Sequence, residues 1–146
     1  MLTRAVLMPS LFQRPDAAKE SNASGSVALH SALQFNAAEA VVRTVLEAWP
    51  NAINEKDGKD GTTALHTALY GTASEAVVLN LKAAWPGAVE EKDHYGNTPM
   101  HAALWGECSS EAATLAVFQA WPDVAKEKNS NGFTPLPVEI PPICNR

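Results

Sequence analysis

A segment that recurs along the chain is the feature that most constrains its fold. The copies occupy residues 25–33, 61–69, 96–104 and 132–137. In the first three copies a glycine is followed five residues later by His30, His66 or His101, and these histidines are 36 and 35 residues apart. Pro137 takes the histidine position in the fourth copy. Internal repeats of this length are typical of arrays of supersecondary units, none of which can bury its apolar face alone.

Each copy has the pattern of a helix start. Thr98 is suited to the N-cap, because its side-chain oxygen can accept a hydrogen bond from a free backbone N–H. Pro99 then fits the first helical position, where its fixed φ favours the helix and its missing N–H costs nothing. The sequence therefore predicts a first helix at the start of every unit.

A second helical pattern follows each first helix. Asn36 and Thr72 stand three residues before Glu39 and Glu75, an arrangement that predicts capping boxes. In the third unit Ser109 is the predicted cap. Apolar residues at helical spacing predict one buried stripe per unit. The predicted stripes are Val41, Val42, Val45 and Leu46, then Val77, Val78 and Leu81, then Leu115, Val117 and Phe118.

The pair Trp-Pro ends each second helical pattern. It occupies residues 49–50, 85–86 and 121–122, spaced by 36 residues. Because proline disfavours the helical conformation of the residue before it, the helix is predicted to end there. The polar and charged segments that follow, residues 55–60, 91–95 and 127–131, predict hairpin-like loops that lead into the next glycine.

Both ends of the chain depart from the repeat. Residues 15–25 align with residues 122–132, so residues 1–14 stand where a preceding second helix would lie, but Pro9 indicates a degenerate one. Pro141 and Pro142 limit a fourth first helix to about two turns. The predicted organisation is an N-terminal flank of residues 1–14, a repeat array of residues 15–137 and a proline-rich tail of residues 138–146. The complete units are predicted at about residues 25–60, 61–95 and 96–131.

The motif Gly-Asn-Thr-Pro-Met-His-Ala-Ala at residues 96–103 resembles the ankyrin repeat signature. The resemblance covers residues 15 to about 137, in units slightly longer than the usual length of about 33 residues, with Trp-Pro after the second helix in place of the family's Gly-Ala. It implies an all-α solenoid of helix-turn-helix units joined by hairpin loops. In such a solenoid the first helices and the hairpin tips build an extended concave surface.

Two recurring columns of residues are predicted to be structural. His30, His66 and His101 would stack about 8 to 10 Å apart, too far to share a metal ion with ligand bonds of about 2 Å. The resemblance implies that they hydrogen-bond each turn to its neighbour. Packing between repeats is likewise predicted for the tryptophan column in preference to a stacking platform. That column is Trp49, Trp85 and Trp121.

The candidate binding residues come from the variable columns, which face the groove in ankyrin-like units, and from the adjoining hairpin, which carries His94 and Tyr95. They are Gln34, Thr62, Thr67, Tyr70, His94, Tyr95, Asn97, Ala102, Trp105 and Phe133. Exposed tyrosine and tryptophan dominate interface hot spots, so Tyr70 and Trp105 predict a partner lying across the second and third units. The alternative is that these residues form ordinary amphipathic surface.

The charge and the cysteines restrict the partner and the compartment. A formal net charge of -5 with dispersed Lys and Arg gives no basic footprint for nucleic acid. No apolar run approaches the roughly 20 residues of a membrane helix. Cys108 and Cys144 lack metal-site spacing and suit free thiols in a reducing compartment. A cytoplasmic chain is predicted, with the nucleus as the alternative, and acid-free residues 1–14 leave an organelle presequence as a third reading.

The sequence favours a binding module that recognises a protein or peptide, with no catalytic residues, metal or cofactor of its own. No Ser, Cys or acid recurs beside the histidines at a spacing that suits a catalytic triad. The alternative is a structural spacer, a fragment of a longer array or a targeting segment of a larger ankyrin-repeat protein.

Overall fold

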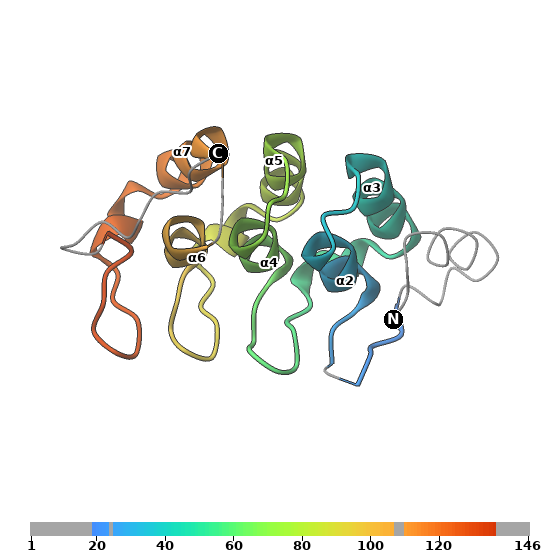
Figure 1. Ribbon diagram of the computed structural model, residues 1–146, viewed down its shortest axis with the longest axis horizontal. Coiled ribbons are helices and arrows are strands. Elements are labelled where there is room, and N and C mark those ends of the chain that lie inside the picture. Colours follow the sequence, from blue (N-terminus) through green and yellow to red (C-terminus); the bar gives the residue numbers. More distant parts are fainter. Residues whose placement is uncertain (1–18, 24, 107–109, 137–146) are drawn as a thin grey trace.

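The computed structural model describes residues 19–23, 25–106 and 110–136, and the regular structure within them is helical (Figure 1). Six α-helices and three complete short 3-10 helices succeed one another in this part of the chain. Ser21 and Val27 form an isolated antiparallel β-bridge that does not extend into a strand. The all-α class is therefore confirmed. The predictions for residues 1–14 and 138–146 lie outside the described residues.

The elements form three successive units, each with a short α-helix, a longer α-helix and a 3-10 helix. The first unit contains α2 (Ala28–Gln34), α3 (Glu39–Ala48) and η2 (Pro50–Asn54). The second contains α4 (Ala64–Tyr70), α5 (Glu75–Ala84) and η3 (Pro86–Glu90). The third contains α6 (Pro99–Trp105), α7 (Glu111–Ala120) and η4 (Pro122–Lys126). The hairpin loops, residues 55–63, 91–98 and 127–136, follow the 3-10 helices.

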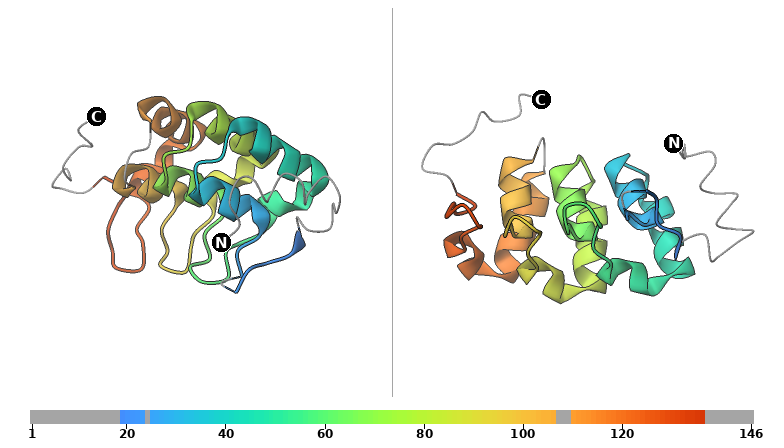
Figure 2. Two further views of the ribbon diagram at one scale, coloured as in Figure 1. Left: turned by 45° about the vertical axis from the view of Figure 1, so that its right-hand side comes forward. Right: turned by 90° about the horizontal axis from the view of Figure 1, so that it is seen from below.

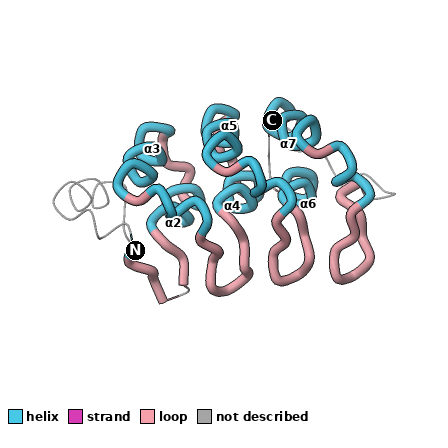
Figure 3. The backbone as a smooth tube through the Cα atoms, turned by 180° about the vertical axis from the view of Figure 1, so that it is seen from behind, coloured by secondary structure: helices cyan, strands magenta, loops and turns pink. Residues whose placement is uncertain are grey.

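The helices lie in two rows. Helices α2, α4 and α6 contact one another in sequence along the first row, and α3, α5 and α7 do so along the second (Figures 1 and 2). Each short helix also packs on the longer helix of its own unit. The hairpin loops project side by side from the edge of the first row (Figure 3). One face of the molecule is thus built from short helices and loops that belong to different units.

A continuous hydrophobic core joins the two rows and all three units. Leu29, Leu65 and Leu69 are fully buried on the short helices, and Val78 and Leu81 are fully buried on α5. Removing a leucine side chain of this kind from water stabilises the fold by about 1.5 to 3 kcal/mol. Because the same cluster runs through every unit, each unit depends on its neighbours for burial.

The predicted starts of the short helices are confirmed at α4 and α6. Thr98 is the N-cap of α6 and Pro99 is its first residue. Thr63 caps α4 with a side chain that accepts a hydrogen bond from the His66 amide. The preceding Gly61 has φ +69°, and a Cβ there would lie 2.3 Å from a ring carbon of His94, so glycine is required.

The predicted caps of the longer helices are wrong. Helix α5 begins at Glu75 after Ser74, whose side chain accepts from the Val77 amide, and Ser110 serves α7 in the same way. Helix α3 begins at Glu39 after Ala38, which has no side-chain cap. Glutamate is therefore the first helical residue, two positions earlier than the third helical position that a capping box needs. Asn36 and Thr72 lie in the turn before it, and Ser109 falls outside the described residues.

The longer helices end at the predicted Trp-Pro pairs, but the chain then continues helically. Each tryptophan is the C-cap, and the proline after it begins a 3-10 helix, which the sequence analysis did not predict. Proline is tolerated there because the first helical position needs no amide hydrogen. These short helices bury Ala52, Ile53, Ala88, Val89 and Val124 in the core.

The buried stripe of α7 differs from the prediction. Val117 is buried, whereas Leu115 and Phe118 are 48% and 37% exposed. Counting by the repeat, Leu115 corresponds to Arg43, which points to solvent on α3. Periodicity alone placed Leu115 on the apolar face. In the first unit Leu46, also predicted to be buried, is half-buried. Within the described residues, no helix is long and apolar enough to cross a membrane.

Candidate binding groove

A cavity of about 630 Å³ opens between the hairpin loops and the short helices α2 and α4. Its volume is in the range of ligand-binding clefts. We call this cavity the groove. It is lined by Ser26, His30, Gln34, Asp57, Asp60, Thr62, Thr67, Tyr70, Gly71, Asp93 and Tyr95. Because the first and second units and the second hairpin loop all contribute, the groove exists only when the units are stacked.

Asp57 organises the first hairpin loop. Its Oδ1 accepts hydrogen bonds from the amides of Lys59, at 2.7 Å, and Asp60, at 3.1 Å, and its Oδ2 accepts one from the Ser26 hydroxyl. Partial burial raises the pKa of Asp57, but these hydrogen bonds outweigh it and hold the pKa below its usual value. Asp57 is therefore a charged, internally satisfied wall of the groove.

Asp93 and Asn97 organise the second loop in the same manner. Asp93 Oδ1 accepts from the amides of Tyr95 and Asn97, both at 2.8 Å, and Asp93 Oδ2 accepts from Asn97 Nδ2 at 3.1 Å. Asn129 Nδ2 donates to Asn97 Oδ1 at 2.9 Å, which ties the third loop to the second. Asn97 is buried with its amide engaged at both ends, so the prediction that it contacts a partner is wrong.

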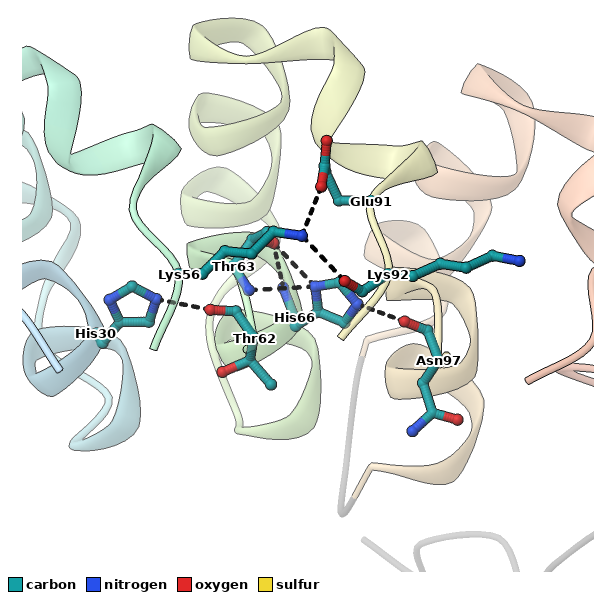
Figure 4. A network of polar contacts seen from close by, with 8 residues as sticks. All are labelled: His30, Lys56, Thr62, Thr63, His66, Glu91, Lys92 and Asn97. Atoms are coloured by element: carbon teal, nitrogen blue, oxygen red, sulfur yellow. Dashed lines mark hydrogen bonds and ion pairs between the residues drawn. The ribbon is translucent and has the colours of Figure 1, made fainter. Parts of the chain in front are cut away.

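The backbones of adjacent loops are also joined. The His94 amide donates to the Asp60 carbonyl at 2.9 Å, and the Ser130 amide donates to the Tyr95 carbonyl at 2.9 Å. On the helix side, Lys56 forms an ion pair with Glu91 at 2.7 Å and donates to the Lys92 carbonyl (Figure 4). Partly exposed ion pairs of this kind contribute about 0 to 1 kcal/mol. The loops consequently behave as one connected layer.

Two tyrosines form the aromatic part of the groove. Tyr70 is half-buried, and its burial together with the charge of Asp93 raises its pKa to about 12. Tyr95 is exposed, and its hydroxyl donates to Asp60 Oδ1 at 3.2 Å. That hydrogen bond, followed by the charge of Asp60, raises the pKa of Tyr95. Both rings are therefore neutral at physiological pH.

The histidine column connects each short helix to the next hairpin loop, as Figure 4 shows for His30 and His66. The Nε2 atoms of His30, His66 and His101 lie 3.0, 2.9 and 3.0 Å from the carbonyl oxygens of Thr62, Asn97 and Phe133. A carbonyl oxygen only accepts, so Nε2 carries a hydrogen in each of the three rings. These bonds run between units, as the resemblance implies.

Burial keeps the imidazoles unprotonated. It lowers the pKa of His66 to about 4, and it lowers the pKa of His30 and His101 as well. The Nδ1 of His66 accepts from the amide and the hydroxyl of Thr63, which closes the cap of α4. In the first unit Val27 replaces that threonine, and the buried His30 Nδ1 has no hydrogen-bond partner among the described residues.

Only some of the predicted binding residues lie in the groove. Those that line the groove are Gln34, Thr62, Thr67, Tyr70 and Tyr95. His94 is exposed at the tip of the second loop, outside the groove. Ala102 is completely buried on α6, which packs on α4 and α7, and its prediction as a contact residue is wrong.

Trp105 and Phe133 lie away from the groove, in the third unit. The Trp105 indole donates from Nε1 to the Pro135 carbonyl at 3.0 Å, and its ring meets Phe133 edge-on with centroids 6.4 Å apart. The groove thus lies over the first and second units, whereas Tyr70 and Trp105 predicted a site over the second and third. The Trp49, Trp85 and Trp121 side chains are half-buried against the core.

The acidic residues of the groove are not among the binding residues that the sequence predicts. Asp57, Asp93 and Asn129 are spaced by 36 residues, so the repeat period itself singles out this position. Asp60 lies on the variable loop tip and has no such signal. Among the described residues, no three His, Cys, Asp or Glu side chains come together closely enough to hold a metal ion. Compared with protein-family models and with curated proteins, the chain matches none.

Proposed function

We propose that the chain is a solenoid of ankyrin-like repeats that binds a protein or peptide in the groove and performs no chemistry itself. The observation that carries the proposal is the groove, whose walls come from short helices and loops of successive units. An extended surface made in this way is typical of repeat proteins that bind other proteins. The recurring Gly-x-Thr-Pro-x-His motif and the two rows of helices support the repeat assignment.

The connected loops support a preorganised binding surface. The His66 and Asn97 contacts link the second and third units, and the His94 amide links the first and second loops. A surface fixed before binding loses less conformational entropy when a partner arrives. Binding is therefore proposed to occur without rearrangement of the helices.

The groove side chains support a role without catalysis. Ser26 donates its hydroxyl hydrogen to Asp57, and the Nε2 of His30 is engaged by the Thr62 carbonyl. An activated nucleophile needs a base within hydrogen-bond reach that is itself free to take the proton. Asp57, which receives the Ser26 hydroxyl hydrogen bond, also accepts from the amides of Lys59 and Asp60, so its carboxylate is engaged in holding the loop.

Selection of binders from an unbiased displayed library of short peptides tests the proposal. Binders are titrated into the isotope-labelled chain, and the amide shift changes are expected at Thr67, Tyr70 and Tyr95. Gln34→Trp places a large ring in the groove and is expected to weaken these binders by about tenfold or more. The matched control is Gln119→Trp, an identical change at an exposed position of α7.

The proposal fails if selected binders map elsewhere or bind the Gln34→Trp variant as tightly as the parent chain. The spacer alternative predicts such a result, since a structural spacer does not need to bind a peptide in the groove. Circular dichroism of both variants checks that each retains the parent helix content.

A further inference from the structure

We infer that the groove accepts a cationic side chain, an arginine or lysine carried on an extended segment of a partner protein, with Asp60 as its carboxylate. The inference rests on the proposed binding function and adds the chemistry of the partner. Three observations support it: the charge of the lining, the bonding state of each carboxylate and the aromatic rings.

The groove lining is acidic without any compensating base. Asp57, Asp60 and Asp93 line it, and no lysine or arginine does. Among the lining residues His30 is the side chain that could become positively charged, and burial lowers its pKa and so keeps it neutral. A concave site lined by one sign of charge focuses the field and raises the local concentration of opposite charge. The groove therefore favours cations and disfavours acidic peptides and nucleic acid.

The bonding state of the three carboxylates distinguishes Asp60 from the others. Asp57 and Asp93 are bound to amides of their own loops, which leaves them as background charge. Asp60 is half-buried, and its Oδ1 accepts from the Tyr95 hydroxyl. Within the described part of the chain its Oδ2 takes no hydrogen bond. This oxygen is the acceptor available to an ammonium or guanidinium group.

The aromatic and neutral polar groups of the lining suit the same ligand. Tyr70 and Tyr95 place two neutral rings in the groove, and a cation over such a ring gains further stabilisation. The Thr62 and Gln34 side chains offer further acceptor oxygens along the groove.

The spacing of the acids favours a side chain on a peptide over a bound metal ion. The three carboxylates are distributed along two loops, and within the described residues they do not converge on one point. A metal ion needs several ligand atoms at about 2 to 2.6 Å. An extended segment instead places one cation at Asp60 while the remaining acids act over longer distances.

Two displayed peptide libraries test the inference. They are identical except that the central residue is arginine or lysine in one and glutamine in the other. Binding is measured to the full chain, to Asp60→Asn and to the control Asp123→Asn, which removes the same charge at an exposed site of η4. Asparagine keeps the oxygen that accepts from Tyr95, so the loop is expected to remain folded.

The cationic library is expected to supply the binders whose shifts map to the groove. Asp60→Asn should weaken them about tenfold, as expected for loss of a hydrogen bond to a charged group, and Asp123→Asn should leave them within about twofold. Raising the salt from about 0.1 M to about 1 M shortens the screening length from about 10 Å to about 3 Å and should weaken them further.

Groove binders that come equally from the glutamine library, or that tolerate Asp60→Asn and high salt, would overturn the inference while leaving the proposed function intact. If neither library yields a binder that maps to the groove, both the proposed function and the inference fail.

Discussion

At the residue scale, the two ring nitrogens of His66 make two different structural hydrogen bonds. His66 closes the cap of its own helix through Nδ1 and holds the next loop through Nε2, and it is completely buried while doing so. A buried polar group is tolerated only when its hydrogen bonds are made, and here both ring nitrogens are used. The residue therefore links local helix formation to the stacking of units.

Replacing His66 with alanine is expected to lower the free energy of unfolding by about 3 kcal/mol. The change leaves the Thr63 amide and the Asn97 carbonyl without partners and opens a cavity between two units. Urea denaturation measures the effect. His94→Ala is the control, because His94 is exposed and the contact of its Nδ1 with the Lys59 carbonyl oxygen is long, at 3.3 Å. Equal midpoints for the two variants would refute the structural role.

The first unit offers the reverse experiment. Val27 has φ -84° and ψ 169°, nearly the conformation of Thr63, with φ -81° and ψ 168°, but it has no hydroxyl for the buried His30 Nδ1. Val27→Thr is expected to raise the free energy of unfolding by about 1 kcal/mol by satisfying that nitrogen. Thermal denaturation measures it, and Val42→Thr, at a buried helix position on α3, should destabilise instead.

At the element scale, the three longer helices begin after residues with similar backbone angles, but only two of these residues have a capping side chain. Ser74 and Ser110 cap α5 and α7, whereas α3 begins after Ala38. The dihedral angles of Ala38, φ -59° and ψ 149°, are close to those of Ser74, φ -65° and ψ 154°. The geometry of a cap is therefore in place in the first unit without the side chain that would use it.

Ala38→Ser is expected to stabilise the chain by about 1 kcal/mol, because serine at an N-cap satisfies one of the free amides of the first turn. Equilibrium denaturation in urea, with an unchanged slope, measures it. The control Ala40→Ser introduces the same side chain inside α3 and should be neutral or slightly destabilising. A gain of equal size in both variants would show that the cap is not its source.

At the scale of the whole molecule, stability is expected to depend on pH between about 4 and 6.5, because the histidine column joins the units in its neutral form. The pKa of His66 is about 4 when folded and 6.5 when unfolded. In that window the unfolded chain binds more protons, so stability is complete above about pH 6.5, falls as the pH is lowered and levels off below about pH 4. His30 and His101, whose pKa values are also lowered, act in the same direction.

Between about pH 7 and pH 5, His66 alone is expected to remove about 2 kcal/mol of stability. Urea denaturation at a series of pH values measures this change in the chain and in His94→Ala, which should show the same dependence because it retains the buried column. A free energy of unfolding that stays constant across this range would contradict the buried, neutral state of the imidazoles.

The sequence by itself determined the helical class, the period and the first-helix caps. These features are local: Thr98-Pro99 and the Trp-Pro pairs fix where helices start and stop through backbone geometry and hydrogen bonding within a few residues. The repeat period also placed the histidines in one column and five of the groove residues on one face, since every unit presents equivalent positions alike.

Only the tertiary structure decided how those positions are used. Thr67 and Ala102 share a column, but Thr67 lines the groove and Ala102 is completely buried against its neighbours. Likewise Asn97 has a polar side chain typical of a surface residue, yet its amide group is hydrogen-bonded to Asp93 of the second loop and to Asn129 of the third. Burial and hydrogen-bond partners across units depend on side chains about 30 residues apart, and no pattern within one unit contains them. The location of the groove, and the acids that line it, follow from that stacking.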